Sequence, residues 1–80
     1  MTDELKDAIL EALEYCTANH EKGHLGYAVS YLQNMDRAVR EYGDSALPVQ
    51  LLYALNNMGA WKGEDARRVK AVLKKYTKIG

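Results

Sequence analysis

The apolar residues between positions 25 and 42 recur at a spacing that would place them on one face of a helix. They are three or four positions apart, in the series Leu25, Ala28, Leu32, Met35, Val39 and Tyr42. This a/d pattern continues for about two and a half heptads. A second stripe lies beside it, formed by Tyr27, Tyr31, Asn34 and Ala38. Because these residues cover more than one face, we predict a helix at 24–42 that is either central or also meets another chain.

The rest of the chain has the same helical spacing, with glycines at the breaks and no strand-like alternation. Thr2 is a good N-cap for the first helix, and Gly43 is a good stop for the second. Pro48 suits the first turn of a third helix, and Glu64 suits that of a last one. Short connections favour antiparallel neighbours. We therefore expect one all-α domain spanning residues 1–80, a compact, up-and-down bundle of three to four helices with short loops. The expected helices are residues 3–19, 24–42, 48–58 and 64–76.

Size and composition limit the class of protein and the cellular compartment to be expected. Its 80 residues are 48% hydrophobic and 28% charged, an ordinary mix for a globular domain. No apolar run approaches the roughly 18 residues that a membrane span needs, and the acidic start at Asp3 and Glu4 is unlike a signal peptide. The single cysteine, Cys16, cannot form an internal disulfide. We therefore expect a cytoplasmic protein without membrane contact.

The charges are unevenly distributed although the net charge is zero. Residues 1–24 hold six acidic and two basic side chains, and residues 62–80 hold seven basic and two acidic ones. Such ends could pair head-to-tail between two copies of a homodimer, which high salt should then weaken by screening. They could equally pack beside each other within one chain.

Residues 20–24 read His20-Glu21-Lys22-Gly23-His24, which resembles the H-E-x-x-H motif of zinc metalloproteases. On a helix this spacing holds zinc between two imidazoles, with the glutamate activating water. Cys16, four residues earlier, would extend the same stripe. However, Gly23 favours a helix stop, no third ligand is evident, and the chain is too short for the protease cleft. We therefore predict no enzyme, no cofactor and no metal; the candidate ligands, were there a metal, are His20, His24 and Cys16.

The last two expected helices and the turn between them resemble a helix-turn-helix. Basic side chains of the last helix are suited to phosphate contacts, namely Arg67, Arg68, Lys70, Lys74 and Lys75. Against this, the turn is long, and Glu64 and Asp65 would repel phosphate where base contacts normally form. The sequence pI of about 6.7 is also low for a DNA-binding domain. A nucleic-acid-binding transcriptional regulator is therefore our second interpretation.

Tyrosine is the dominant aromatic residue of this chain, with six tyrosines, one tryptophan and no phenylalanine. Tyrosine is enriched at interfaces because one end of its side chain is apolar and the other polar. Tyr27 and Tyr31 lie one helical turn apart and off the main seam, so they are our candidates for a partner contact. The alternative is that both pack on a neighbouring helix with their hydroxyls at the surface.

The segment Val49–Tyr76, VQLLYALNNMGAWKGEDARRVKAVLKKY, resembles the short helical accessory proteins that phages and mobile elements encode. Such proteins often bind a host protein and block or redirect it, so the resemblance implies an inhibitor or adaptor. We therefore predict a protein-binding module that pairs with itself as a homodimer or binds a larger protein partner, with nucleic acid as the alternative. The predicted partner-binding residues are Tyr27, Tyr31, Arg67, Arg68, Lys70 and Lys74.

Overall fold

Five helices follow one another along the chain in the computed structural model, which describes residues 1–77. Within that range there is no strand, so the expected all-α class is confirmed. Residues 1–77 form five helices, so the expected number of three to four is wrong. The helices are α1 (Asp3–Ala18), α2 (Leu25–Gln33), α3 (Met35–Tyr42), α4 (Ala46–Asn56) and α5 (Glu64–Lys75).

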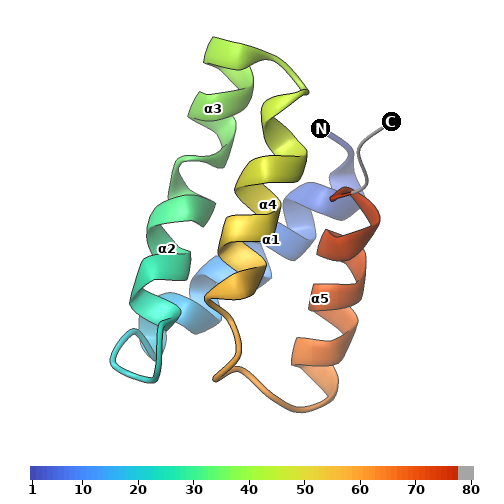
Figure 1. The fold of residues 1–80 in the computed structure, drawn as a ribbon. Helices are drawn as coiled ribbons and strands as arrows, with labels where there is room; N and C mark the ends of the chain where they lie inside the picture. Colours follow the sequence, from blue (N-terminus) through green and yellow to red (C-terminus); the bar gives the residue numbers. More distant parts are fainter. Residues whose placement is uncertain (78–80) are drawn as a thin grey trace.

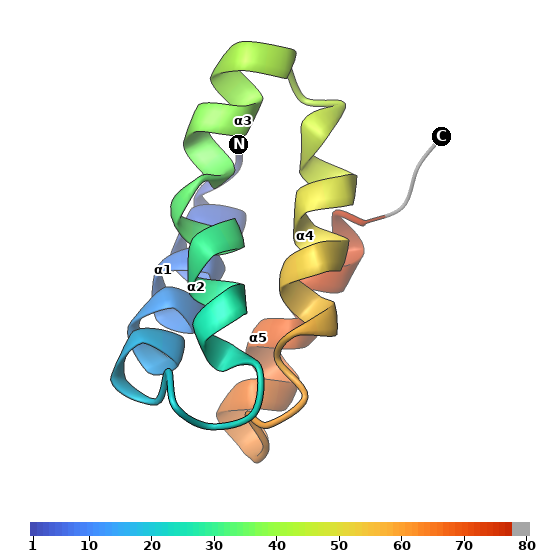
Figure 2. The same cartoon turned by 60° about the vertical axis from the view of Figure 1, so that its left-hand side comes forward.

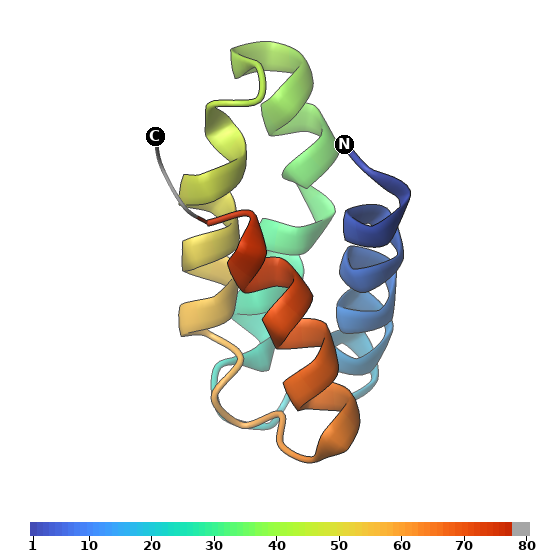
Figure 3. The ribbon, with the colours of Figure 1, turned by 90° about the vertical axis from the view of Figure 1, so that its right-hand side faces the viewer.

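Because α3 continues the course of α2, the five helices form four rods. Successive rods run in opposite directions (Figure 1). Helix α1 packs against α2 and α5, while α4 packs against α2, α3 and α5. Seen from the side of α5, helices α4 and α1 flank it (Figure 3). Within the described residues, the backbones of α1 and α4 do not come into contact. The rods therefore close into a ring in which α1 and α4 lie diagonally opposite each other.

One apolar core fills this ring and draws on every helix and on the loop before α5. None of the described residues that are buried is polar or charged. Fully burying a large apolar side chain contributes about 1.5–3 kcal/mol, so this core is the main source of stability. The largest fully buried side chains include Leu5, Leu25, Met35, Leu51, Met58, Val69 and Leu73.

A break at Asn34 divides the long helix that the apolar spacing predicts at 24–42. The side-chain amide of Asn34 donates to the carbonyl of Ser30 at 2.8 Å, and the backbone N–H of Asn34 reaches the same oxygen at 3.2 Å. An asparagine side chain that bonds local backbone competes with the helical hydrogen bonds. The prediction of one helix was therefore wrong, although Gly43 does follow its last residue, with φ 79°.

The beginning of α1 lies where the sequence predicts it. Thr2 is the N-cap, and its hydroxyl accepts a hydrogen bond from the N–H of Leu5 at 3.2 Å. The helix ends at Ala18, one residue before the expected end. The side-chain amide of Asn19, which follows, donates to the carbonyl of Tyr15 at 2.9 Å.

Helix α4 begins and ends two residues earlier than the expected range of 48–58. Pro48 is its third residue rather than its first, which costs no hydrogen bond because the first four N–H groups of a helix have no partner within it. The helix ends at Asn56, and Asn57 is its C-cap. The side-chain amide of Asn57 donates to the carbonyl of Tyr53 at 2.8 Å. The last helix, expected at 64–76, ends one residue earlier.

Candidate partner-binding face

Helices α2 and α4 contain no aspartate, glutamate, lysine or arginine. They pack side by side, with the loops at their lower ends close together (Figure 2). All eleven acidic and all eleven basic residues of the chain lie outside these two helices. One side of the molecule is therefore built from two neighbouring helices without charge.

The outer surface of this helix pair is apolar and open to solvent. Tyr27 of α2 is 65% exposed and Tyr53 of α4 is 49% exposed, with Val49 and Leu52 also exposed. The ring of Tyr31 stacks on that of Tyr53, with centroids 5.3 Å apart and planes 26° apart. We call these five residues the tyrosine face. Contiguous apolar surface of this kind marks interaction sites on soluble proteins.

The exposure of α4 follows from its having two apolar sides. Leu47, Leu51 and Ala54 recur at four and three positions and enter the core. The residues between them, which include Val49 and Leu52, point away from it. A helix that is apolar all round is normally covered on all sides. The outer side of α4 is therefore an apolar surface that the chain itself leaves uncovered.

The two tyrosines predicted as partner contacts differ in their surroundings. Tyr31 is half-buried against Tyr53 of the neighbouring helix, which is the packing alternative that the sequence left open. Tyr27 is exposed, and its ring centroid lies 5.7 Å from that of His24. Sequence reasoning missed Val49, Leu52 and Tyr53. The uncharged stretch from residue 45 to 61 would have pointed to them.

Two of the predicted basic residues bind within the chain rather than facing solvent alone. Arg68 forms an ion pair with Glu11 of α1 and a longer one, 3.4 Å, with Asp65. Its hydrogen bonds to Glu11 and then to Asp65 raise the pKa of Arg68. The ammonium of Lys70 donates to the carbonyl of Trp61 at 2.6 Å, and burial lowers the pKa of Lys70. Arg68 therefore joins α5 to α1, and Lys70 joins α5 to the loop before it.

A second ion pair joins the same two helices near the other end of α5. Lys75 donates to both carboxylate oxygens of Glu4, at 2.9 and 3.0 Å, and Tyr76 donates to Glu4 at 3.1 Å. We call the two cross-helix pairs, Glu4–Lys75 and Glu11–Arg68, the charge seam. The acidic and basic parts of the chain thus lie beside each other in one molecule. Within residues 1–77, neither Arg67 nor Lys74 forms an ion pair with its side chain.

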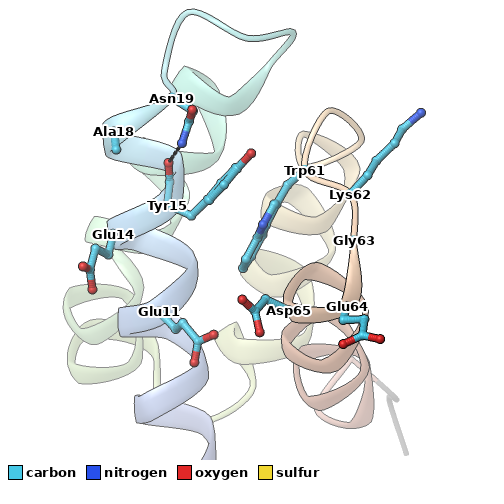
Figure 4. A pocket seen from close by; sticks show the side chains of 10 residues that line it. All are labelled: Glu11, Glu14, Tyr15, Ala18, Asn19, Trp61, Lys62, Gly63, Glu64 and Asp65. Atoms are coloured by element: carbon cyan, nitrogen blue, oxygen red, sulfur yellow. Dashed lines mark hydrogen bonds between the residues drawn. The ribbon is translucent and has the colours of Figure 1, made fainter.

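A cavity of about 580 Å³ opens between α1 and the start of α5 (Figure 4). Tyr15 and Trp61 stack beside it, with ring centroids 4.7 Å apart and planes 15° apart. Glu11 and Asp65 approach it from the two helices, and both contact Arg68. Trp61 is only 3% exposed, so its ring belongs to the core. The acidic lining of this cavity thus supplies counter-charges to α5.

The H-E-x-x-H sequence lies in the turn between α1 and α2, not on a helix. Gly23 has φ 49°, a conformation that breaks the helical register between the two histidines. The side chain of His20 is 70% exposed, whereas Cys16 is fully buried, and burial raises the pKa of its thiol. In the part of the chain that the structure describes, no group of three His, Cys, Asp or Glu side chains could hold a metal ion.

Comparisons of the chain with protein-family models, with curated proteins and with solved structures give no match. Among the described residues, no helix combines the length and the apolar character needed to cross a membrane. The tyrosine face is the surface of this chain that the packing of its own helices explains least.

Proposed function

We propose that this protein is a small protein-binding module that docks a partner protein on the tyrosine face. The observation that carries the proposal is the uncharged, apolar outer surface of α2 and α4, beside helices that all carry charges. The centres of protein interfaces are depleted in charged residues and enriched in tyrosine and other aromatic residues. The same composition would be unfavourable on a surface that remained in water.

The arrangement of the tyrosines supports tight contact at low entropic cost. Tyrosine offers a large contact area while fixing only two side-chain torsions. The stack on Tyr31 already restricts Tyr53 before a partner arrives, and such preorganisation improves affinity. A standard interface buries about 800 Å² on each partner, and a side of a molecule with extents of 31 × 21 × 19 Å is of that order.

The proposed role is that of an inhibitor or adaptor of the kind that phages and mobile elements encode. Such a module works by covering or bridging a surface of its partner, and it needs no catalytic group. We place its action in the cytoplasm, because the one thiol, Cys16, is free and buried, as suits a reducing compartment.

The nucleic-acid alternative has weaker support. Phosphate binding needs several uncommitted cations on one surface, yet Arg68 and Lys70 already bind groups of this chain. The connection between α4 and α5 covers seven residues, 57–63, which is longer than the usual turn of a helix-turn-helix. Of the four predicted basic residues, Arg67 and Lys74 are exposed and form no ion pair within residues 1–77.

The deciding experiment is a tagged pull-down from native lysate with nuclease, followed by mass spectrometry. The test variant is Tyr27→Ala/Tyr53→Ala, and the matched control is Arg67→Glu/Lys74→Glu on α5. We expect one protein at stoichiometric yield with the wild type and the control, and its loss with the tyrosine variant. Circular dichroism verifies that all three remain helical.

The opposite pattern supports the alternative. If the captured material disappears with nuclease and with the α5 variant, yet persists with the tyrosine variant, α5 is the working surface and the proposal is wrong. A partner that is retained equally by all three proteins would also exclude the tyrosine face as its docking site.

A further inference from the structure

A second apolar surface lies on the other flank of α2, where α1 meets α2 and α3. A groove of about 340 Å³ opens there between the helices. Its floor includes Ile9, Leu32 and Met35, which are buried, and Leu13, which is partly buried. Beside the floor stands Leu10, 62% exposed although it is a leucine on a helix. An apolar knob and an apolar hollow therefore lie next to each other on one side of the molecule.

The two walls of this groove carry opposite charges. Lys6 lies on the α1 wall and Asp36 on the α3 wall, and both line the groove and are exposed. Within residues 1–77, neither forms an ion pair. The groove is therefore complementary in charge to a surface that presents an acidic group opposite α1 and a basic group opposite α3.

We propose that this groove is the interface of a homodimer, with a second copy of this chain as its occupant. A two-fold axis along the groove brings α1 of each copy against α2 and α3 of the other. Lys6 then faces Asp36 of the second copy, and by symmetry the same pair forms twice. Leu10 of each copy packs over Leu32 and Met35 of the other. A single two-fold rotation thus covers the exposed Leu10, fills the apolar groove and pairs Lys6 with Asp36.

The charge seam and the tyrosine face are poorer dimer surfaces. A head-to-tail dimer would need the seam, but Glu4 and Glu11 already bind Lys75 and Arg68 of their own chain. The tyrosine face has no charge that could fix the register of two copies, whereas charged groups across an interface do so. Of the three surfaces, the groove is the one that offers both apolar contact and a register.

The dimer does not depend on the proposed partner binding, because it uses the flank of α2 that faces away from α4. A chain that dimerises through the groove leaves both tyrosine faces open. Loss of the dimer with retained partner capture, or the reverse, therefore separates the two proposals.

Sedimentation equilibrium of the full chain over micromolar to millimolar concentration tests the dimer. We expect a reversible monomer–dimer equilibrium, with a Kd that rises roughly 10- to 100-fold in Leu10→Lys because a leucine loses its apolar contact. The matched control is Leu52→Lys, an exposed leucine on α4, which should leave the Kd unchanged. Both substitutions are at exposed positions, and thermal melts confirm that the variants fold.

A charge exchange tests the register. Lys6→Glu and Asp36→Lys should each raise the Kd by roughly two- to fivefold, and the double variant should restore it. A wild type that stays monomeric up to about 1 mM, about the weakest association to be expected of this dimer, overturns the proposal. A dimer that resists Leu10→Lys, or that only Leu52→Lys dissociates, also overturns it. Single effects without restoration exclude the two-fold register in which Lys6 faces Asp36.

Discussion

Two stacked aromatic pairs join helices of this protein, and their surroundings differ. Tyr15 and Trp61 stack between α1 and the loop before α5, with the tryptophan 3% exposed. Tyr31 and Tyr53 stack between α2 and α4, with Tyr53 49% exposed. The first pair lies beside Glu11 of the charge seam, and its tryptophan is buried in the core. The second lies on the side of the molecule without charge and has no cover.

The difference shows that two similar aromatic stacks can have different roles in one small domain, one in the core and one on an exposed surface. Around Trp61, Arg68 binds Glu11 and Lys70 donates to the Trp61 carbonyl, so polar contacts within the chain join the loop and both helices here. Around Tyr53, no charged group lies on either helix, and the apolar surface ends in water. An incomplete surface is where a further molecule gains most from binding.

The largest expected effect concerns the buried stack. Trp61→Ala should lower the free energy of unfolding by about 3–5 kcal/mol, because it leaves a cavity in the core. Tyr53→Ala should lower it by only about 0.5–1.5 kcal/mol, since half of that side chain is exposed. Urea unfolding of both variants beside the wild type gives the two values. Equal losses would mean that the Tyr31–Tyr53 stack holds the fold together as strongly as the buried Tyr15–Trp61 stack does.

Binding of the partner should depend on Tyr53 more strongly than the stability of the fold does. Tyr53→Ala should weaken the affinity for the captured partner by at least about 2 kcal/mol, as expected for an aromatic anchor at the centre of an interface. Titration calorimetry with the purified partner measures the change. Leu10→Lys, at an exposed position of α1 beside the groove, is the control and should bind as the wild type does. Unchanged affinity in Tyr53→Ala would remove Tyr53 from the interface.

Much of the helical architecture could be predicted from the sequence, because its evidence is local. The Thr2 cap and the glycine after α3 act through neighbouring backbone groups, and both lie where expected. The break at Asn34 was missed because the apolar spacing continues across it. Its cause is also local: at the ends of three helices an asparagine side chain donates to the carbonyl four residues before it. In this chain an asparagine directly after a helical segment marks the end of a helix, as a glycine also does.

The candidate site was harder to predict, because exposure depends on which helices become neighbours. Tyr27 and Tyr31 lie off the main seam, and their spacing suggested an outer stripe. That Tyr31 would meet Tyr53 depends on α4 lying beside α2, and no local pattern fixes this. Likewise, the separated acidic and basic ends could pair either within one chain or between two copies. The ring of helices places α1 against α5, so the two ends lie beside each other within one chain.

A smaller effect is expected at the charge seam. Glu11→Arg should lower the free energy of unfolding, because it sets like charges side by side with Arg68. The effect should be smaller than that of Trp61→Ala, since the side chains of Arg68 and Glu11 are 58% and 40% exposed and solvent screens their charges. The exchange variant Glu11→Arg/Arg68→Glu should recover most of the loss in the same urea experiment. Failure to recover would show that Glu11 acts through another contact, or that a glutamate at position 68 is repelled by Asp65, the second partner of Arg68.

The smallest expected effect is a dependence of stability on pH that arises at Glu4. Hydrogen bonds from Lys75 and then Tyr76 hold the pKa of Glu4 below its usual value of 4.5. A carboxylate whose pKa is lower in the folded state stabilises that state above its usual pKa, and this stabilisation disappears as the pH falls through the lowered value. Glu4→Gln should therefore be less stable than the wild type at neutral pH and equally stable in acid.

Urea unfolding of the wild type and Glu4→Gln between neutral pH and about pH 2, which lies below the usual carboxyl range, measures this difference. Glu14→Gln is the matched control, because Glu14 is an exposed glutamate on α1 without an ion pair among the described residues. A difference that grows as the pH falls would have the wrong sign for a lowered pKa. It would mean that the bond between Glu4 and Lys75 does not hold in solution, and that the seam closes at Glu11 and Arg68 alone.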